Sequence, residues 1–231
     1  MNQPMIVAID GPAGAGKSTV AKLIASKLGY AYLDSGALYR ALAWKALATG
    51  TDPTSSAAMS LLCSATRLKL SSSKGGSVAV EADGRILTDE IRSPEVSRAA
   101  SQVAALPEVR AWLLPVQQAF GRHAGLRGVV AEGRDIGTRI FPDAPAKFFL
   151  EATPAERARR RHEELQATGR AVDLIATQQE LEARDKRDRD RESAPLVPAP
   201  DAVVIDTTRL SLEQVVARIL SMTESKAAAL R

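Results

Sequence analysis

The sequence predicts an α/β fold: a parallel sheet flanked by helices, interrupted by a small antiparallel insertion. Short apolar runs alternate with amphipathic segments along the 231 residues, and most of these runs lack a polar alternation. Strands of that kind are buried on both faces and, when separated by helices, are typical of parallel sheets. A different pattern, in which strand-like runs are joined by turn signals, occupies residues 66–88 and predicts the insertion.

The parallel sheet is expected to use five short runs, each too short for a helix: residues 5–9, 30–33, 128–131, 146–150 and 202–205. Helices are expected at residues 17–28 and 36–48, in the charge-dense region 153–191, and near 211–222. Ser211 is the expected cap of the last helix.

The insertion reads as a three-stranded meander. Its runs are "TRLKL", "SVAVEA" and "RILT", separated by a turn in "SSSKGG" and by a tight turn at Asp83 and Gly84. Asp-Gly between two strand-like runs is a strong hairpin signal. We therefore expect one large domain with an insertion.

The composition limits the function classes. Lys and Arg total 31 against 27 Asp and Glu, so the net charge is only +4 and the chain is no polycation. That balance suits anionic small molecules at least as well as nucleic acid. Cys63 is the single cysteine, which excludes an internal disulfide, and no metal-ligand spacing is present. With no signal-like N-terminus and no apolar run near the ~18 residues of a membrane span, we expect a cytoplasmic protein.

A phosphate-binding loop is predicted by the stretch "DGPAGAGKST". Gly11, four further residues and then Gly16, Lys17 and Ser18 match the pattern G-x-x-x-x-G-K-[ST]. Glycines let such a loop turn its N–H groups toward a polyphosphate, the lysine adds a positive charge, and the hydroxyl can ligate Mg²⁺. The alternative, a glycine-rich turn that binds nothing, is disfavoured by the strand before it and the helix after it.

A second anion site is suggested by "LDSGALYR". Ser35 and Gly36 open a helix, and Arg40 lies one turn further along the same side. An ordinary capped helix with a solvated arginine explains the pattern about equally well.

Charged residues also follow a buried strand in "VVAEGRDIGT". Glu132, Arg134 and Asp135 lie beyond the carboxyl end of that strand, where ligands bind in open α/β sheets. A local ion pair is the alternative. Arg110 precedes Trp112 in "VRAWLLP", and the tryptophan is expected in the core.

The stretch "ARDKRDRDRESAP" contains a second candidate cluster. On a helix, Arg184, Asp188 and Arg191 fall on one face and suit a phosphate and a sugar hydroxyl. Pairs such as Asp185 with Arg189 are expected to be surface ion pairs of little energetic weight. From this stretch alone, a solvated face is the favoured interpretation.

The basic helix "TPAERARRRHEE" has a clear start, with Thr153 as cap and Glu156 at the third position. Arg157 and Arg161 share a face, with Arg160 beside them. The segment suits a mobile lid that brings arginines to a transferring phosphoryl group. A nucleic-acid patch or a solvated helix are the alternatives.

Taken together, these motifs resemble those of bacterial cytidylate kinases. "IDGPAGAGKST", "LDSGALYR", "AASQVAALPEVR", "EGRDIGT", "FPDAPAKFFL" and "RDKRDRDRESAPLVPAPDA" follow one another as in that family over nearly the whole chain. The resemblance implies a P-loop NTPase-type core with a five-stranded parallel sheet. It also implies a nucleotide-binding region that contains a three-stranded antiparallel sheet, and a short helical lid. The corresponding regions are 1–34, 103–152 and 171–231 for the core, 35–102 for the nucleotide-binding region with its meander at 66–88, and 153–170 for the lid.

The resemblance also implies residue roles. The ATP phosphates would be held by Gly11, Pro12, Ala13, Gly14, Ala15, Gly16, Lys17, Ser18 and Thr19. The acceptor phosphate would be held by Ser35, Arg40, Arg134 and Arg191, and the acceptor sugar by Arg184 and Asp188. The base would be read by Ser101, Arg110 and Asp135, with Tyr39 packed against the acceptor. The catalytic residues would be Lys17, Arg134, Arg157, Arg161 and Arg191.

The implied reaction is in-line transfer of the ATP γ-phosphoryl group to CMP or dCMP, with Mg²⁺ as cofactor and Ser18 as its one identifiable protein ligand. Neither a nucleic acid, a membrane nor an obligate protein partner is expected, and a monomer is the expected state. Two rivals remain: a kinase for another acceptor such as UMP or a non-nucleotide acid, and a non-catalytic nucleotide switch or RNA-binding protein. The absence of an aromatic stacking platform among the arginines disfavours RNA.

Overall fold

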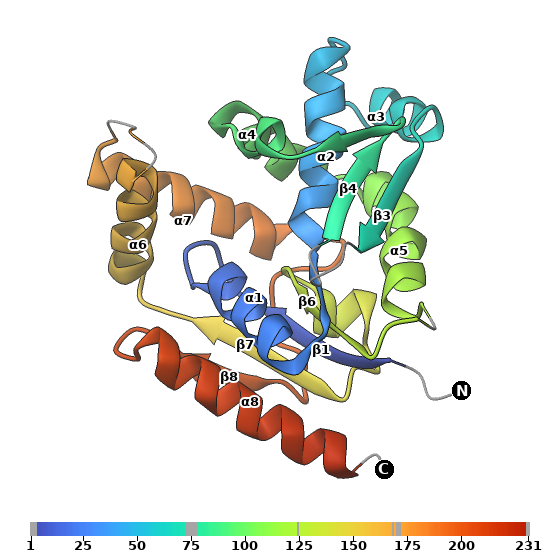
Figure 1. Ribbon diagram of the computed structural model, residues 1–231. Coiled ribbons are helices and arrows are strands. Elements are labelled where there is room, and N and C mark those ends of the chain that lie inside the picture. Colours follow the sequence, from blue (N-terminus) through green and yellow to red (C-terminus); the bar gives the residue numbers. More distant parts are fainter. Residues whose placement is uncertain (1–3, 73–77, 124, 168, 170–171, 230–231) are drawn as a thin grey trace. The chain divides into compact units, whose positions relative to one another are not determined.

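The fold is described from a computed structural model, in which residues 4–72, 78–123, 125–167, 169 and 172–229 are described. A five-stranded sheet has the strand order β2-β6-β1-β7-β8, and a separate three-stranded sheet has the order β3-β4-β5 (Figure 1). The five strands are β1 (Met5–Asp10), β2 (Ala31–Asp34), β6 (Gly128–Glu132), β7 (Ala146–Glu151) and β8 (Val203–Asp206). The registered pairs of β1 with β7 and of β7 with β8 are parallel, as the apolar runs predict.

Contacts divide the chain into two compact units, Met1–Ile6 with Ala25–Ala131, and Val7–Ile24 with Glu132–Arg231. The first unit contains the three-stranded sheet and most of the helices around it (Figure 1). Besides β2 and most of β6, its elements are α2 (Ser35–Ala48), α3 (Ser56–Ser64), β3 (Leu68–Ser72), β4 (Val78–Ala82), β5 (Arg85–Leu87), η1 (Asp89–Arg92), α4 (Pro94–Val103) and α5 (Pro107–Gly121).

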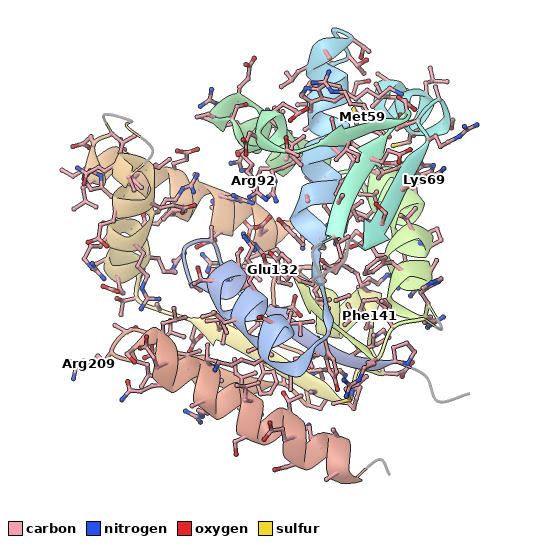
Figure 2. All side chains as sticks on the ribbon, viewed as in Figure 1. Met59, Lys69, Arg92, Glu132, Phe141 and Arg209 are labelled. Atoms are coloured by element: carbon pink, nitrogen blue, oxygen red, sulfur yellow. The ribbon has the colours of Figure 1, made fainter. Side chains whose placement is uncertain are left out.

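Antiparallel pairing in the small sheet confirms the predicted meander. Asp83 and Gly84 form its second turn with positive φ angles of 52° and 85°, the conformation that a tight hairpin requires. The first predicted turn, at residues 73–77, lies outside the described residues. Leu38, Leu42 and Met59 are fully buried in the core of this unit, and Met59 is labelled on α3 in Figure 2.

Helix caps in the first unit follow the local sequence. The Asp34 side chain accepts from Ala37 N at the start of α2, and Ser93 caps α4 immediately before Pro94. The helices α3, α4 and α5 were not predicted as separate elements.

Besides β7, β8 and most of β1, the second unit contains the loop before α1, the first part of α1, three further helices and a short π-helical turn. These elements are α1 (Lys17–Leu28), of which the first part belongs here, η2 (Ile136–Ile140), α6 (Pro154–Ala167), α7 (Leu174–Asp190) and α8 (Leu212–Ala229). The helices α6 and α7 pack on each other, and α8 packs on β7 (Figure 1). In the described part of the chain, no helix is long and apolar enough to cross a membrane.

Two predicted boundaries in this unit differ from the structure. The last helix begins after its predicted cap, where Ser211 Oγ accepts from Gln214 N at 3.3 Å, but it continues to Ala229. The helix α7 ends at Asp190, and Arg191 has an extended backbone with ψ of 138°. Arg191 is therefore not on the helical face predicted for it, because the chain turns away toward the proline-rich segment that follows.

Candidate active site

The glycine-rich loop between β1 and α1 is held against neighbouring backbone. Gly11 has a φ angle of 144°, and a Cβ atom there would lie 2.0 Å from the carbonyl oxygen of Leu150. Gly14 has a φ angle of 77°, and its Cβ would lie 2.8 Å from the carbonyl oxygen of Arg157. At both positions a side chain would meet backbone atoms in a conformation that L residues avoid. The predicted loop therefore depends on glycine for packing as well as for its turn.

Lys17 opens α1 with a buried side chain, and its Nζ donates to Pro12 O at 2.7 Å. Burial, reinforced by the Arg134 guanidinium, lowers the pKa of Lys17 from 10.5 to about 7. The carboxylates of Glu132 and Asp185 oppose this shift. Glu132 is labelled in Figure 2 at the end of β6, near the loop before α1. The site thus concentrates positive charge away from water. An anionic ligand bound here would neutralise that charge.

The peptide groups of Ala13 are bound by a buried ion pair. Asp185 Oδ1 accepts from Ala13 N at 3.2 Å, and Arg157 Nη1 donates to Ala13 O at 2.9 Å and to Asp185 Oδ2. Asp185 is 0% exposed, so the expectation of a surface pair with Arg189 is wrong. Packing of α6 against α7 faces this carboxylate inward, which the local charge pattern does not reveal.

The remaining arginines of α6 are bound to neighbouring residues. Thr153 Oγ1 accepts from Glu156 N at 3.4 Å, as the predicted helix start requires. Arg160 donates to Glu156 and to Thr207, while Arg161 pairs with Glu164 near the surface. The catalytic role of Arg161 stays a prediction.

Four predicted acceptor residues lie together in the second unit, around Asp188. Arg134 Nε donates to Asp188 Oδ2 at 3.0 Å, and Arg191 Nη1 lies 3.6 Å from the other carboxylate oxygen. Arg191 Nη2 lies 3.9 Å from Asp135 Oδ1. Burial alone would raise the pKa of Asp188, but Arg134, Arg184 and Arg191 together lower it. The structure brings Arg134 and Asp135, which follow β6, together with Asp188 and Arg191 at the end of α7; Arg134 and Asp188 are 54 positions apart in the sequence.

A second group of predicted acceptor residues lies in the first unit. Arg40 pairs with Asp34, and Ser35 is buried at the first position of α2. The Arg110 guanidinium lies 5.5 Å from the centre of the Tyr39 ring. Arg40 is thus an ion-paired residue and not the freely solvated one of the alternative interpretation.

Ser101 belongs to the same unit. Its hydroxyl is buried on α4 and has no hydrogen-bond partner among the described residues. A buried hydroxyl of this kind is a costly group to leave unpaired, and a polar ligand would satisfy it.

Sequence reasoning missed Asp10. Its carboxylate ends β1, is 4% exposed, and accepts from Ile136 N and Gly137 N, both at 2.8 Å. Burial raises the pKa of Asp10 to about 6, against the two backbone hydrogen bonds. The sequence signal was a carboxylate at the end of an otherwise apolar strand. Such a residue is expected to be buried and therefore to need hydrogen-bond partners.

The chain matches the family model described as cytidylate kinase over residues 7–225. It is 47% identical over 226 residues to a cytidylate kinase of Desulfitobacterium hafniense, with 98% of this chain and 95% of that protein covered. A cytidylate kinase of Pelotomaculum thermopropionicum is 48% identical over 221 residues, with 96% of each chain covered.

A longer protein of Synechococcus, a bifunctional pantoate ligase/cytidylate kinase, is 51% identical over 217 residues. This match covers 94% of the present chain, which spans only 44% of that protein. A crystal structure of an uncharacterized protein from Eubacterium ventriosum matches this chain with a TM-score of 0.52 at 13% sequence identity. The match covers 96% of this chain and 99% of that protein's chain, and it shows similarity of fold alone.

Proposed function

The chain belongs to the cytidylate kinase family, and from this premise we propose that it transfers the γ-phosphoryl group of ATP to CMP and dCMP. The single observation that carries the proposal beyond the family match is the glycine loop with its buried Lys17. Burial and Arg134 lower the pKa of Lys17 to about 7 and so disfavour its charged form. A phosphate bound beside Lys17 would stabilise the charged ammonium group. The products are ADP and CDP or dCDP.

The donor is proposed to lie along the loop before α1. The loop N–H groups and the N-terminal end of α1 would bind its phosphates, and Lys17 would add its charge. The residues proposed for this site are Gly11, Pro12, Ala13, Gly14, Ala15, Gly16, Lys17, Ser18 and Thr19.

Mg²⁺ is proposed as the cofactor of the donor. Among the described residues, no group of three or more His, Cys, Asp or Glu side chains could hold a metal ion. At nucleotide sites Mg²⁺ takes ligands from substrate phosphates and waters as well as from the protein, so the exposed Ser18 hydroxyl at the start of α1 fits it. When bound, the ion supplies positive charge to the phosphate oxygens.

The acceptor phosphate is proposed to be bound by arginines and one hydroxyl, namely Ser35, Arg40, Arg134 and Arg191. The ion pairs of Arg40 with Asp34 and of Arg134 with Asp188 support this role, because each orients a guanidinium group and leaves it further donors for a phosphate. The sugar is assigned to Arg184 and Asp188.

The cytosine base is proposed to be read by Ser101, Arg110 and Asp135, with Tyr39 packed against the acceptor. Cytosine offers an amino donor to a carboxylate and acceptor atoms to a guanidinium or hydroxyl. Uracil reverses this polarity, so Asp135 would face an acceptor oxygen of the base instead of an amino donor, and the wrong base would bind poorly. The buried Ser101 hydroxyl has no hydrogen-bond partner in the described part of the chain, which supports its place in this set.

For the chemical step, we propose that an oxygen of the acceptor α-phosphate attacks the γ-phosphorus as the bond to the β,γ-bridging oxygen breaks. The acceptor is already an anion at neutral pH, so no strong general base is needed. Positioning and charge neutralisation then carry the catalysis. Lys17, Arg134, Arg191 and Arg161 are proposed to share the neutralisation.

The proposed functional regions are the core at 1–34, 103–152 and 171–231, the nucleotide-binding region at 35–102 and the lid at 153–170. Residues 168, 170 and 171 lie outside the described part. We propose a cytoplasmic monomer that needs no nucleic acid, membrane or protein partner. Its nearly balanced charge supports the absence of a nucleic-acid partner, and a measurement of molecular size in solution checks the monomeric state.

The test is ATP consumption with Mg²⁺ and each of CMP, dCMP, UMP and AMP, for the wild-type protein and for Asp135→Ala. We expect a strong preference for the two cytidine nucleotides, lost in the variant. Asp143→Ala, at an exposed position beyond the same segment, should keep the preference. If no monophosphate stimulates turnover, the chain is not a nucleoside monophosphate kinase. Tight, strongly salt-dependent RNA binding would then favour the RNA-binding alternative.

A further inference from the structure

The tip of the phosphate loop is held by three charged side chains from three helices. Lys17 Nζ binds Pro12 O at 2.7 Å, and Asp185 binds the N–H of the same peptide group through Ala13 N at 3.2 Å. The next peptide oxygen, Ala13 O, accepts from Arg157 Nη1 at 2.9 Å. Two consecutive peptide groups of the loop are thus oriented by side chains of α1, α7 and α6.

We propose that Arg157 and Asp185 are positioning residues that hold the phosphate loop in its ATP-binding shape and join it to α6 and α7. This inference rests on the proposed function, because it assigns the loop to ATP. It gives Arg157 a different role from the catalytic one that the sequence predicts.

The hydrogen bonds of the pair support a holding role. Arg157 also donates from Nε to Ala152 O at 3.1 Å, so its guanidinium binds two backbone oxygens and one carboxylate. Asp185 uses one oxygen for Ala13 N and the other for Arg157. An arginine with these partners must give up a buried ion pair before it can reach another anion, and breaking such a pair is costly.

Packing around the pair joins the loop to both helices. Ala13, Ala158 of α6 and Leu181 of α7 form a small buried apolar cluster. On α7, Asp185 lies between two proposed sugar-binding residues, directly after Arg184 and three positions before Asp188. The helix that carries acceptor residues is therefore the one that fixes the donor loop.

A variant of Asp185 tests the positioning role by itself, because this residue is not expected to contact ATP directly. Its carboxylate is fully buried and negatively charged, so it has no favourable contact to make with a phosphate. Any effect of this residue on ATP must act through Ala13, Arg157 or Lys17.

The experiment compares Asp185→Asn with the wild-type protein. The asparagine keeps an oxygen for Ala13 N and removes the charge that holds Arg157. We expect kcat/KM for ATP and the affinity for ATP, measured calorimetrically without acceptor, to fall by about tenfold or more, since small misplacements in a site have such effects. The KM for CMP should change by less than about threefold. The control Glu163→Gln breaks an exposed ion pair of Arg159 on α6 and should leave both constants unchanged.

A purely structural role predicts a different result. In that case the Asp185→Asn variant has a lower melting temperature, but at temperatures well below it the variant binds ATP with wild-type affinity. That result would overturn the proposal. An equal rise of KM for both substrates also contradicts it. Because ATP binding is measured without acceptor, the test stands even if the wild-type protein fails to phosphorylate CMP.

Arg157→Lys provides the second variant, which matters if Asp185→Asn does not fold. Lysine keeps the charge beside Asp185 but lacks the planar set of donors that reaches Ala13 O and Ala152 O. The proposal expects weaker ATP binding, with kcat at saturating ATP within about threefold of wild type. A collapse of kcat with unchanged ATP affinity would show instead that Arg157 acts on the transferring group.

Discussion

Lys17 is bound to its own loop, with Nζ donating to the Pro12 carbonyl oxygen over 2.7 Å. A neutral oxygen is a weak partner for a buried ammonium group, and burial together with Arg134 lowers the pKa of Lys17 to about 7. The charge of this lysine is therefore sensitive to whatever binds beside it.

The first prediction is that ATP binding takes up a proton at pH 8. Lys17 is then mostly neutral, and the phosphates raise its pKa, so about one proton enters per ATP bound. At pH 6 the lysine is already charged and its share of the uptake should vanish. Calorimetry in buffers of different ionisation enthalpy measures both values with MgATP. Equal uptake at the two pH values would contradict the assignment.

Gly11→Ala should destabilise the protein and abolish ATP binding. Its Cβ would lie 2.0 Å from Leu150 O, so overpacking adds to the strain of a φ angle of 144°. Gly50→Ala is the matched control, because Gly50 has a φ angle of 67° and none of the described residues has an atom within 4 Å of the added Cβ. It should cost only the strain, about 1–2 kcal/mol. Urea unfolding compares the two, and similar losses would show that the contact with Leu150 does not matter.

Asp10 should make the stability depend on pH between about 4 and 6. Burial raises its pKa from 3.8 to about 6, so the folded state binds more protons than the unfolded state in this range. Its contribution is fully present below pH 3.8 and is lost as the pH rises through 6, by up to about 3 kcal/mol. Asp10→Asn has no such titration. The difference in free energy of unfolding between the two proteins, measured at several pH values, should follow this curve; a flat difference would mean that Asp10 keeps its ordinary pKa.

Asp188→Asn should impair the acceptor side. The change removes the carboxylate that orders Arg134 and Arg191, so the KM for CMP is expected to rise about tenfold or more, while ATP affinity changes little. Asp190→Asn, exposed two positions further along the chain, should behave like wild type. Initial-rate kinetics with each substrate varied in turn gives the values. A larger effect on ATP than on CMP would contradict the assignment of Asp188 to the acceptor side.

Much of the fold could be predicted because it depends on local pattern. The apolar runs at β1, β6 and β7 are unbroken, and their ends agree with the strands to within about a residue. The hairpin at Asp83 and Gly84 follows from the turn that these residues favour. The end of α7 was less predictable, since charged residues continue past Asp190 without a strong stop signal.

By itself, the sequence determined the phosphate loop, the alternation of strands and helices and the antiparallel insertion, because each depends on neighbours within a few residues. Only the tertiary structure decided which charged residues of α6 and α7 are buried and which groups they contact. Ala13 and Asp185 are 172 positions apart, and Arg157 and Asp185 are 28 apart on different helices. A period of 3.6 residues assigns side chains to a face, but the packing of α6, α7 and the loop decides whether that face is buried and which charges it pairs.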